Sequence, residues 1–272
     1  MPTRRPTGDR RPHTRPARLA ALLLAALPLI TLPHGAVAGV ERDAEKMFEQ
    51  MKQQVPISNN ERAKFIVECV ANSLIAVLPE KYADDEWEIV LFDQPEVNAF
   101  AMPGGKIGVF MGIFGVARDQ NALAAVIGHE IAHVTERHAQ KRARRKTLTG
   151  VAAGVATILL GANAPVTGET MRTVNTALNM GAELGLNRPY DRSQESDADI
   201  KGLEYMARAG FDPRESITLW KAMEEVGGHS PPEFLSTHPS GRTRLSDLIG
   251  ALPQSLATFN EAREAGVFPD CQ

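Results

Sequence analysis

Apolar and polar positions along the first part of the chain predict two helices of different character. Residues 41–54 are mostly polar and predict an exposed helix. A stronger helix begins at Asn60 and ends at Pro79, because apolar residues recur between them at helical spacing. These apolar positions predict one buried stripe: Phe65, Ile66, Cys69, Val70, Leu74 and Val77.

Three short segments in the middle of the chain predict strands. Residues 87–92, 97–102 and 107–111 are rich in apolar side chains and have the length of strands. Residues 103–105, with the sequence Pro-Gly-Gly, join the last two segments. They predict a turn, because proline presets its own φ and glycine tolerates a positive φ.

The second part of the chain is mainly helical in its pattern. Helices are predicted at the following residues: 119–146, 195–209, 213–226, 242–252 and 255–265. Asp119 is a suitable N-cap for the first of them, and Gly210 closes the second. Residues 147–162 are apolar and are expected to pack against the domain, whereas residues 163–194 predict loops with one short helix. Helices on both sides of a small strand cluster indicate one α+β domain.

The first 38 residues have the pattern of a signal peptide. An arginine-rich segment precedes an apolar run from Leu19 to Leu32, and residues 36–38 (Ala-Val-Ala) form a small-x-small cleavage site. The apolar run has about fourteen residues, whereas a membrane-spanning helix needs roughly twenty. We therefore predict cleavage after Ala38, an exported, periplasmic protein and a mature domain at residues 39–272. An uncleaved membrane anchor is the alternative.

Charge argues against one class of partner. Removing residues 1–38 changes the net charge from -3 to -8, because 24 basic residues then face 32 acidic ones. A domain this acidic lacks the basic surface of a nucleic-acid-binding protein. Residues 141–146 (Lys-Arg-Ala-Arg-Arg-Lys) are the one basic cluster. They fit a solvated helix end, and they also fit peripheral membrane association through anionic lipid.

The chain contains two cysteines, Cys69 and Cys271. An even pair in an oxidising compartment predicts one disulfide between them, and export favours this interpretation. The alternative is a buried, free Cys69 and a Cys271 in a frayed tail.

Residues 128–133 (Gly-His-Glu-Ile-Ala-His) carry the strongest chemical signal. His129 and His133 lie about 40° apart around a helix, so both imidazoles can reach one zinc ion. Glu130 lies about 100° from His129 and can act as a base without occupying the metal. Zinc lowers the pKa of a water molecule that it binds toward about 7, and a nearby carboxylate can then take the proton.

The third zinc ligand must come from a later part of the chain. His138 lies about 140° from His133 on a continuous helix, so we interpret it as a surface or second-layer residue. Glu195 and Asp199 share one face of a predicted helix and suggest a carboxylate ligand with a second carboxylate supporting a ligand histidine. Alternatively, both only satisfy the dipole at a helix N-terminus. Asp197 faces elsewhere and is the least suitable ligand.

Four blocks of the sequence resemble the HtpX, CAAX prenyl protease and BepA-like family of zinc metallopeptidases, the gluzincins, in its small, soluble, exported branch. The blocks lie in the family's order at these residues: 98–105, 128–133, 193–199 and 236–240 with Arg244. The resemblance implies a mainly helical zincin-type domain with a small sheet beside the active-site helix. It also implies one zinc per chain and these roles: His129, His133 and Glu195 as ligands, Glu130 as base, and Asp199 orienting a ligand histidine.

The leading functional hypothesis is a zinc-dependent endopeptidase. The resemblance implies polypeptide substrates, namely misfolded or misassembled envelope proteins. The alternative is a chaperone-like or assembly-factor module on a zincin scaffold with little turnover. The presence of Glu130 favours the enzyme, because a purely structural zinc site needs no base.

Two further hypotheses concern how substrate and activity are controlled. An extended peptide is expected to add to the edge formed by Asn98, Ala99, Phe100 and Ala101, unless this segment is only part of a core hairpin. His238 precedes Pro239 in a late loop and is expected within a few Å of the zinc. There it either donates to the oxyanion or ligates zinc as an inhibitory plug. A role as a cap of the helix near residues 242–252 is the alternative.

Overall fold

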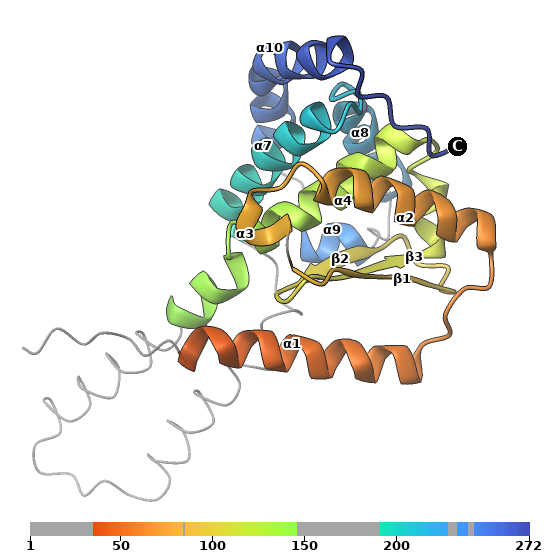
Figure 1. The fold of residues 1–272 in the computed structure, drawn as a ribbon, viewed down its shortest axis with the longest axis vertical. Helices are drawn as coiled ribbons and strands as arrows, with labels where there is room; N and C mark the ends of the chain where they lie inside the picture. The colour runs from red at the N-terminus through yellow and green to blue at the C-terminus, as the bar shows by residue number, and fades with distance from the viewer. Residues whose placement is uncertain (1–34, 84, 146–190, 228–232, 239–241) are drawn as a thin grey trace, which may run out of the picture. The chain divides into compact units, whose positions relative to one another are not determined.

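The computed structural model describes most of the chain from residue 35 onward (Figure 1). The described residues are 35–83, 85–145, 191–227, 233–238 and 242–272. Most of the predicted signal peptide, the apolar segment 147–162 and most of the segment 163–194 lie outside them. Among the residues that are described, no helix is both long enough and apolar enough to cross a membrane.

Helices dominate the described part of the chain and surround one small sheet, which confirms the predicted α+β class. In chain order the elements are α1 (Gly35–Gln54), α2 (Glu61–Ile75), α3 (Glu80–Ala83), β1 (Glu88–Phe92), β2 (Ala99–Met102), β3 (Lys106–Phe110), a 3₁₀ turn (Met111–Gly115), α4 (Gln120–Thr135), α7 (Arg192–Arg208), α8 (Glu215–Gly227), α9 (Glu233–Thr237) and α10 (Arg242–Glu264).

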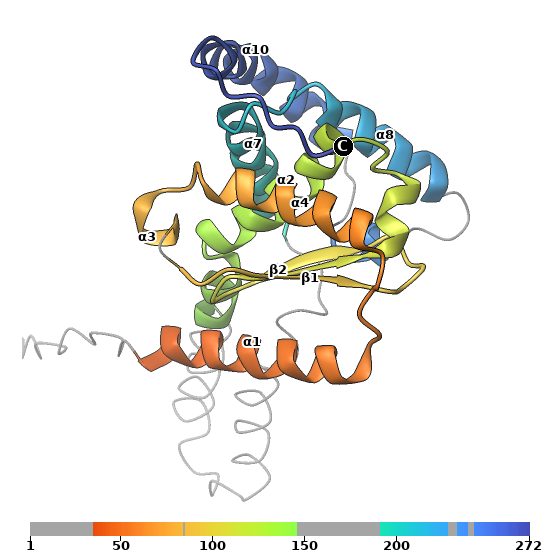
Figure 2. The same ribbon diagram turned by 45° about the vertical axis from the view of Figure 1, so that its right-hand side comes forward.

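The sheet has the strand order β1-β3-β2, so β2 is an edge strand. β1 runs parallel to β3, and β2 runs antiparallel to it. The turn between β2 and β3 contains Gly104 and Gly105 at φ values of 86° and 74°, which confirms the predicted turn and its use of glycine. Figure 2 shows the sheet with α1 on one face and with α2 and α4 on the other.

Helix α1 differs from the exposed helix that the sequence predicts. It begins at Gly35 rather than residue 41, and Phe48 in its middle is fully buried. The Phe48 ring makes edge-to-face contacts with Phe92 and Phe100 of the sheet, with centroids 6.3 Å apart in both pairs. Ala44 is also buried, and Met47, Met51 and Val55 pack on the same side, so the helix does carry an apolar stripe at helical spacing. The prediction of an exposed helix weighed its mostly polar composition and missed this stripe.

Helix α2 begins as predicted but buries a shifted face. The Asn60 side chain caps its N-terminus by accepting a hydrogen bond from the Ala63 backbone N–H at 3.0 Å. The buried residues are Ala63, Val67, Val70, Ala71 and Leu74, and Phe65 of the predicted stripe is instead 54% exposed. The small alanines let α2 pack closely against α4. The predicted stripe contained only larger apolar residues and so missed these alanines.

Three other predicted helices have different ends in the structure. Helix α4 ends at Thr135, and Arg137 adopts a left-handed φ of 54° before residues 138–145 become helical again. Helix α7 begins at Arg192, three residues earlier than predicted. Helix α10 is one continuous helix through Pro253 rather than two short helices. Proline removes one backbone donor, but packing of α10 along α7 keeps the helix together.

Cys69 and Cys271 form a disulfide, which is the pairing expected from the sequence. The C-terminal segment is also held by the first residue of α4. The Gln120 side-chain carbonyl accepts a hydrogen bond from the Cys271 N–H at 2.8 Å, and its amide donates to the Pro269 carbonyl at 3.2 Å. The end of the chain therefore ties α2 to the N-terminal end of α4.

Candidate metal centre

Helices α4 and α7 cross in direct contact at two glycines, Gly128 and Gly202. A Cβ atom on Gly202 would lie 2.9 Å from the His129 backbone nitrogen and 3.0 Å from the Gly128 carbonyl carbon. Such distances leave no room for a side chain larger than hydrogen. Glu195 and Asp199 lie on the same face of α7 as Gly202, so the crossing brings them opposite His129.

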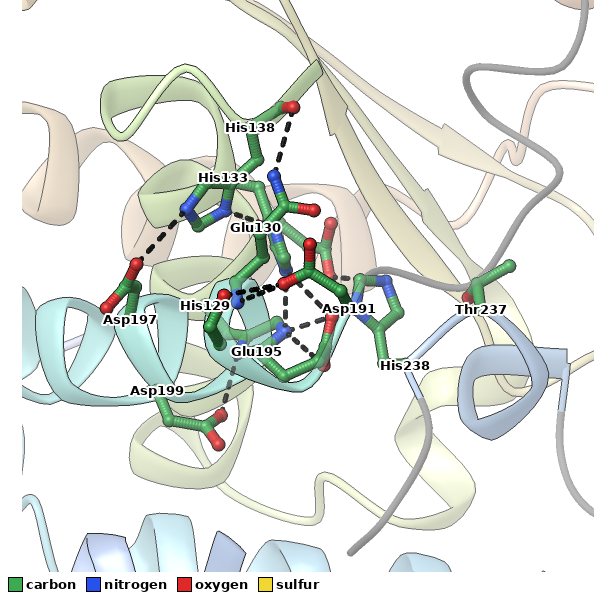
Figure 3. Close-up of polar contacts among 12 residues, drawn as sticks. His129, Glu130, His133, His138, Asp191, Glu195, Asp197, Asp199, Thr237 and His238 are labelled. Carbon is green, nitrogen blue, oxygen red and sulfur yellow. Dashed lines mark hydrogen bonds and ion pairs between the residues drawn. The ribbon is translucent and has the colours of Figure 1, made fainter. Parts of the chain in front are cut away.

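Four buried side chains converge beside this crossing (Figure 3). His129, His133, Glu195 and His238 each offer one ligand atom, and all four atoms lie within 4.8 Å of one another. The Nε2 atoms of His129 and His133 are 3.0 Å apart, and Glu195 carboxylate oxygens lie 3.6 and 3.5 Å from them. Imidazole nitrogens and a carboxylate oxygen are ligands that zinc prefers, so this donor set fits a metal ion.

Glu130 lies next to the cluster without belonging to it. One of its carboxylate oxygens accepts a hydrogen bond from the Ala101 backbone N–H at 3.3 Å. The other oxygen lies 3.3 Å from Nε2 of His238. The carboxylate therefore stands between the metal ligands and strand β2, where a general base for a substrate on that strand would have to be.

A buried arginine connects the carboxylates of α7. The Asp199 carboxylate lies 2.8 Å from Nδ1 of His129, and its second oxygen accepts a hydrogen bond from Nε of Arg244 at 2.6 Å. The same guanidinium group donates to Glu195 and stacks on the Trp220 ring, 3.7 Å from its centroid. Arg244 thus neutralises two buried carboxylates at once, which reduces the cost of removing them from water.

His238 reaches the cluster from the end of α9. Its Nδ1 atom lies 3.1 Å from Nε2 of His129 and 3.3 Å from a Glu195 oxygen. Phe234 stacks on the His238 ring at a centroid distance of 4.6 Å. The imidazole therefore lies within a few Å of the other ligand atoms, which is the position that both hypotheses for His238 require.

Burial and neighbouring charges set the protonation of the ligands. Burial, together with the neighbouring His129 and His238, lowers the pKa of His133 well below its ordinary value. Burial acts to raise the pKa of Glu195, but a hydrogen bond from His238 and nearby positive charges outweigh it and hold this pKa at about 2. A neutral His133 and an ionised Glu195 are the forms in which these side chains bind metal.

His138 lies directly behind the cluster. It is fully buried, so its interpretation as a surface residue is wrong, whereas a position in the second layer agrees with the structure. Its Nδ1 atom lies 2.8 Å from Nδ1 of His133, and its Nε2 lies 3.9 Å from Asp197. The angle expected from the sequence assumed a continuous helix, and the left-handed Arg137 ends that continuity.

The segment predicted to bind substrate lies at the edge of the sheet beside Glu130. The backbone carbonyl of Asn98 accepts a hydrogen bond from the Phe110 N–H at 3.0 Å. The antiparallel ladder therefore turns the backbone groups of Asn98 and Phe100 toward β3. The backbone groups of Ala99 and Ala101 therefore point outward, and no described strand pairs with that side. This outer side is partly occupied, because the Ala101 N–H donates to Glu130 and the Val97 carbonyl accepts from the Phe234 N–H of α9. Binding of an added strand there stays a prediction.

Several residues that build the site have no recognisable signal of their own in the sequence. Trp220 and Phe234 pack around His129 and His238, and Gly202 permits the helix crossing. Arg244 carries a signal only as part of the block at residues 236–240 that resembles the peptidase family. The position of Gly202, seven residues after Glu195 and thus on the same helix face, is the one feature that could have indicated its role.

Comparisons with known proteins place this chain in a family. Residues 59–251 match the model of Peptidase family M48. The mitochondrial metalloendopeptidase OMA1 of Schizosaccharomyces pombe is 35% identical over 176 residues, which cover 64% of this chain and 49% of that protein. The corresponding values for the metalloendopeptidase OMA1 of Homo sapiens are 35% over 176 residues, 62% and 33%.

A bacterial relative extends this comparison. The beta-barrel assembly-enhancing protease of Escherichia coli strain K12 is 34% identical over 163 residues, which cover 58% of this chain and 32% of that protein. The chain therefore spans about a third to a half of the length of these three relatives.

Gly202→Ala tests the close crossing of α4 and α7. Gly202→Ala places a Cβ against the backbone of α4, so the helices must separate and Glu195 must move away from His129. We expect a stability loss of about 1–3 kcal/mol and weaker metal binding, measured by thermal unfolding and by competition with a chelator. Gly250→Ala on α10 is the control, because its Cβ would meet no atom within 4 Å. Unchanged stability and metal affinity in Gly202→Ala would contradict this account.

Proposed function

This chain belongs to peptidase family M48, and we propose that it is a zinc-dependent endopeptidase that binds one zinc ion through His129, His133 and Glu195. The observation that carries the proposal is the convergence of these three side chains beside Glu130 and beside a strand edge with which no described strand pairs. A bound zinc ion would supply a Lewis acid that polarises the scissile carbonyl and lowers the pKa of water.

The chain's own residues supply the other parts of the reaction. Glu130 takes a proton from the attacking water and passes it to the leaving amine. Burial raises the pKa of this carboxyl above its ordinary value, which makes it a stronger base when ionised. Asp199 keeps the His129 ring oriented, and Arg244 holds Asp199 and Glu195 in place.

The substrates that we propose are polypeptides of the cell envelope, in particular misfolded or misassembled exported proteins. The signal-peptide pattern of residues 1–38 and the disulfide support an oxidising, exported location. The name of the Escherichia coli relative refers to the assembly of β-barrels, whereas the OMA1 relatives are named as mitochondrial. Both kinds of relative thus support peptide hydrolysis, but their names point to different compartments. The proposed exported location therefore rests on the sequence of this chain.

A chaperone-like or assembly-factor module with little turnover is the competing function. It would use the outer side of β2 to hold a polypeptide, without a need for Glu130 beside the ligands. The position of Glu130, within 3.3 Å of the outward Ala101 N–H, favours catalysis. Cleavage of casein that is lost on addition of a chelator would separate the two functions.

Glu130→Gln tests the general base. The variant keeps the size of the side chain but cannot accept a proton, so turnover should fall by at least about 10²-fold while zinc stays bound. Peptide hydrolysis and metal content measure the two effects. Glu204→Gln on α7, which removes a carboxylate outside the cluster, is the matched control and should retain activity. Full activity of Glu130→Gln would end the proposed mechanism.

Ala99→Pro tests the strand edge as the substrate site. The Ala99 N–H points away from β3, so proline removes a donor for substrate without removing a hydrogen bond of the sheet. We expect a higher KM or a lower kcat, with thermal stability close to that of the wild type. Ala99→Ser keeps the N–H and serves as the control. Equal peptide kinetics in both variants would show that substrate binds elsewhere.

His238→Ala tests the late histidine of the cluster. Because His129, His133 and Glu195 are the proposed ligands, the variant should keep its zinc while its turnover changes. Lower turnover would indicate a donor to the oxyanion, and higher turnover would indicate an inhibitory plug. Turnover equal to that of the wild type would contradict both roles. Metal analysis in parallel would detect zinc loss, which would instead make His238 a required ligand.

A further inference from the structure

His129 and His133 of the Gly-His-Glu-Ile-Ala-His segment differ in the group that contacts their Nδ1 atom. Nδ1 of His129 lies 2.8 Å from a carboxylate oxygen of Asp199. Nδ1 of His133 lies 2.8 Å from another imidazole nitrogen, Nδ1 of His138 (Figure 3). In both rings the Nε2 atom faces the cluster, since these two atoms are 3.0 Å apart. One ligand is thus supported by a carboxylate and the other by a histidine.

The chemistry of imidazole gives this contact a direction. A neutral imidazole carries one proton, and the nitrogen that faces a metal cannot carry it. Nδ1 of His133 must therefore carry the proton and donate it. The acceptor, Nδ1 of His138, must be unprotonated, so His138 carries its own proton on Nε2. That atom lies 3.9 Å from the Asp197 carboxylate, whose negative charge favours a proton on this side.

The local backbone is shaped to make the contact. Helix α4 ends at Thr135, and the left-handed Arg137 lets the chain turn before His138 begins the next helical segment. A non-glycine residue with positive φ costs energy and persists only where the surrounding structure compensates for it. Part of that compensation comes from α7, because the Gln194 side-chain amide donates to the His138 carbonyl at 3.2 Å.

We propose that His138 is a positioning residue of the metal centre that accepts a hydrogen bond from His133 and so fixes the tautomer and the orientation of this ligand. The proposal rests on the zinc site proposed above and deepens it. It also gives Asp197, which is too exposed to be a ligand, a supporting place behind His138. His138 is not one of the four residues that offer a ligand atom, and it contacts this cluster through His133.

Two substitutions of His138 separate the hydrogen bond from simple packing. In His138→Asn the side-chain oxygen takes the place of Nδ1 and can accept from His133, whereas His138→Leu fills the space without an acceptor. Zinc affinity is measured on metal-free protein by competition with a chromogenic chelator. We expect His138→Leu to bind zinc about 10–100-fold more weakly and His138→Asn to stay within a few-fold of the wild type.

Tyr205→Phe is the matched control for damage to the same end of α4. It removes a buried hydrogen bond from the Tyr205 hydroxyl to Oγ1 of Thr135 at 3.0 Å, a bond that is distinct from the contact between His133 and His138. We expect lower thermal stability of the metal-free protein and unchanged zinc affinity. If Tyr205→Phe weakened zinc binding as strongly as His138→Leu, general loosening of the helix end would explain both results.

The outcomes distinguish this inference from the proposed function. A wild-type protein that binds no zinc would overturn the proposed function itself. A wild-type protein that binds zinc, with His138→Leu binding it equally well, would overturn only the role of His138. Equal losses in His138→Leu and His138→Asn would also overturn it, because packing alone would then account for the effect. If His138→Leu does not fold, His138→Asn compared with the wild type still tests the acceptor.

Discussion

The site depends on the contact between two helix backbones at Gly128 and Gly202. Only hydrogen atoms fit between the helices there, so α4 and α7 approach more closely than ordinary side chains would allow. The close approach of the two helices lets the Glu195 and Asp199 carboxylates of α7 reach the imidazoles of α4. The donor set therefore results from a packing constraint as much as from the ligand residues themselves.

Close approach of so many polar groups requires compensation for their charges. Glu195 and Asp199 are buried, and an ionised carboxylate in such a place is stable only when it is paired. Arg244 pairs with both, and the Trp220 ring covers its guanidinium group. Helix α10 thus completes the candidate metal centre electrostatically, although Arg244 is not among the four residues that offer a ligand atom.

Strand β2 and helix α9 lie together on one side of this centre. Strand β2 turns the Ala101 N–H toward Glu130, and α9 donates from the Phe234 N–H to the Val97 carbonyl at 3.2 Å. The segment that ends in His238 is therefore attached to the same edge on which we propose that substrate binds. A peptide on this edge and the His238 segment would then have to share the space beside the ligands.

Local sequence was sufficient to place the three strands and most of the helices, but it missed where α1, α4, α7 and α10 begin or end. The spacing of His129, Glu130 and His133 determines their faces on one helix, and the Pro-Gly-Gly turn determines the hairpin of β2 and β3. Tertiary structure decided which elements meet: the burial of Phe48, the pairing of Arg244 with two carboxylates, and the turn at Arg137 that places His138 behind His133. The physical reason is that periodicity records which face of an element is apolar, whereas contacts between distant elements depend on how those faces pack together.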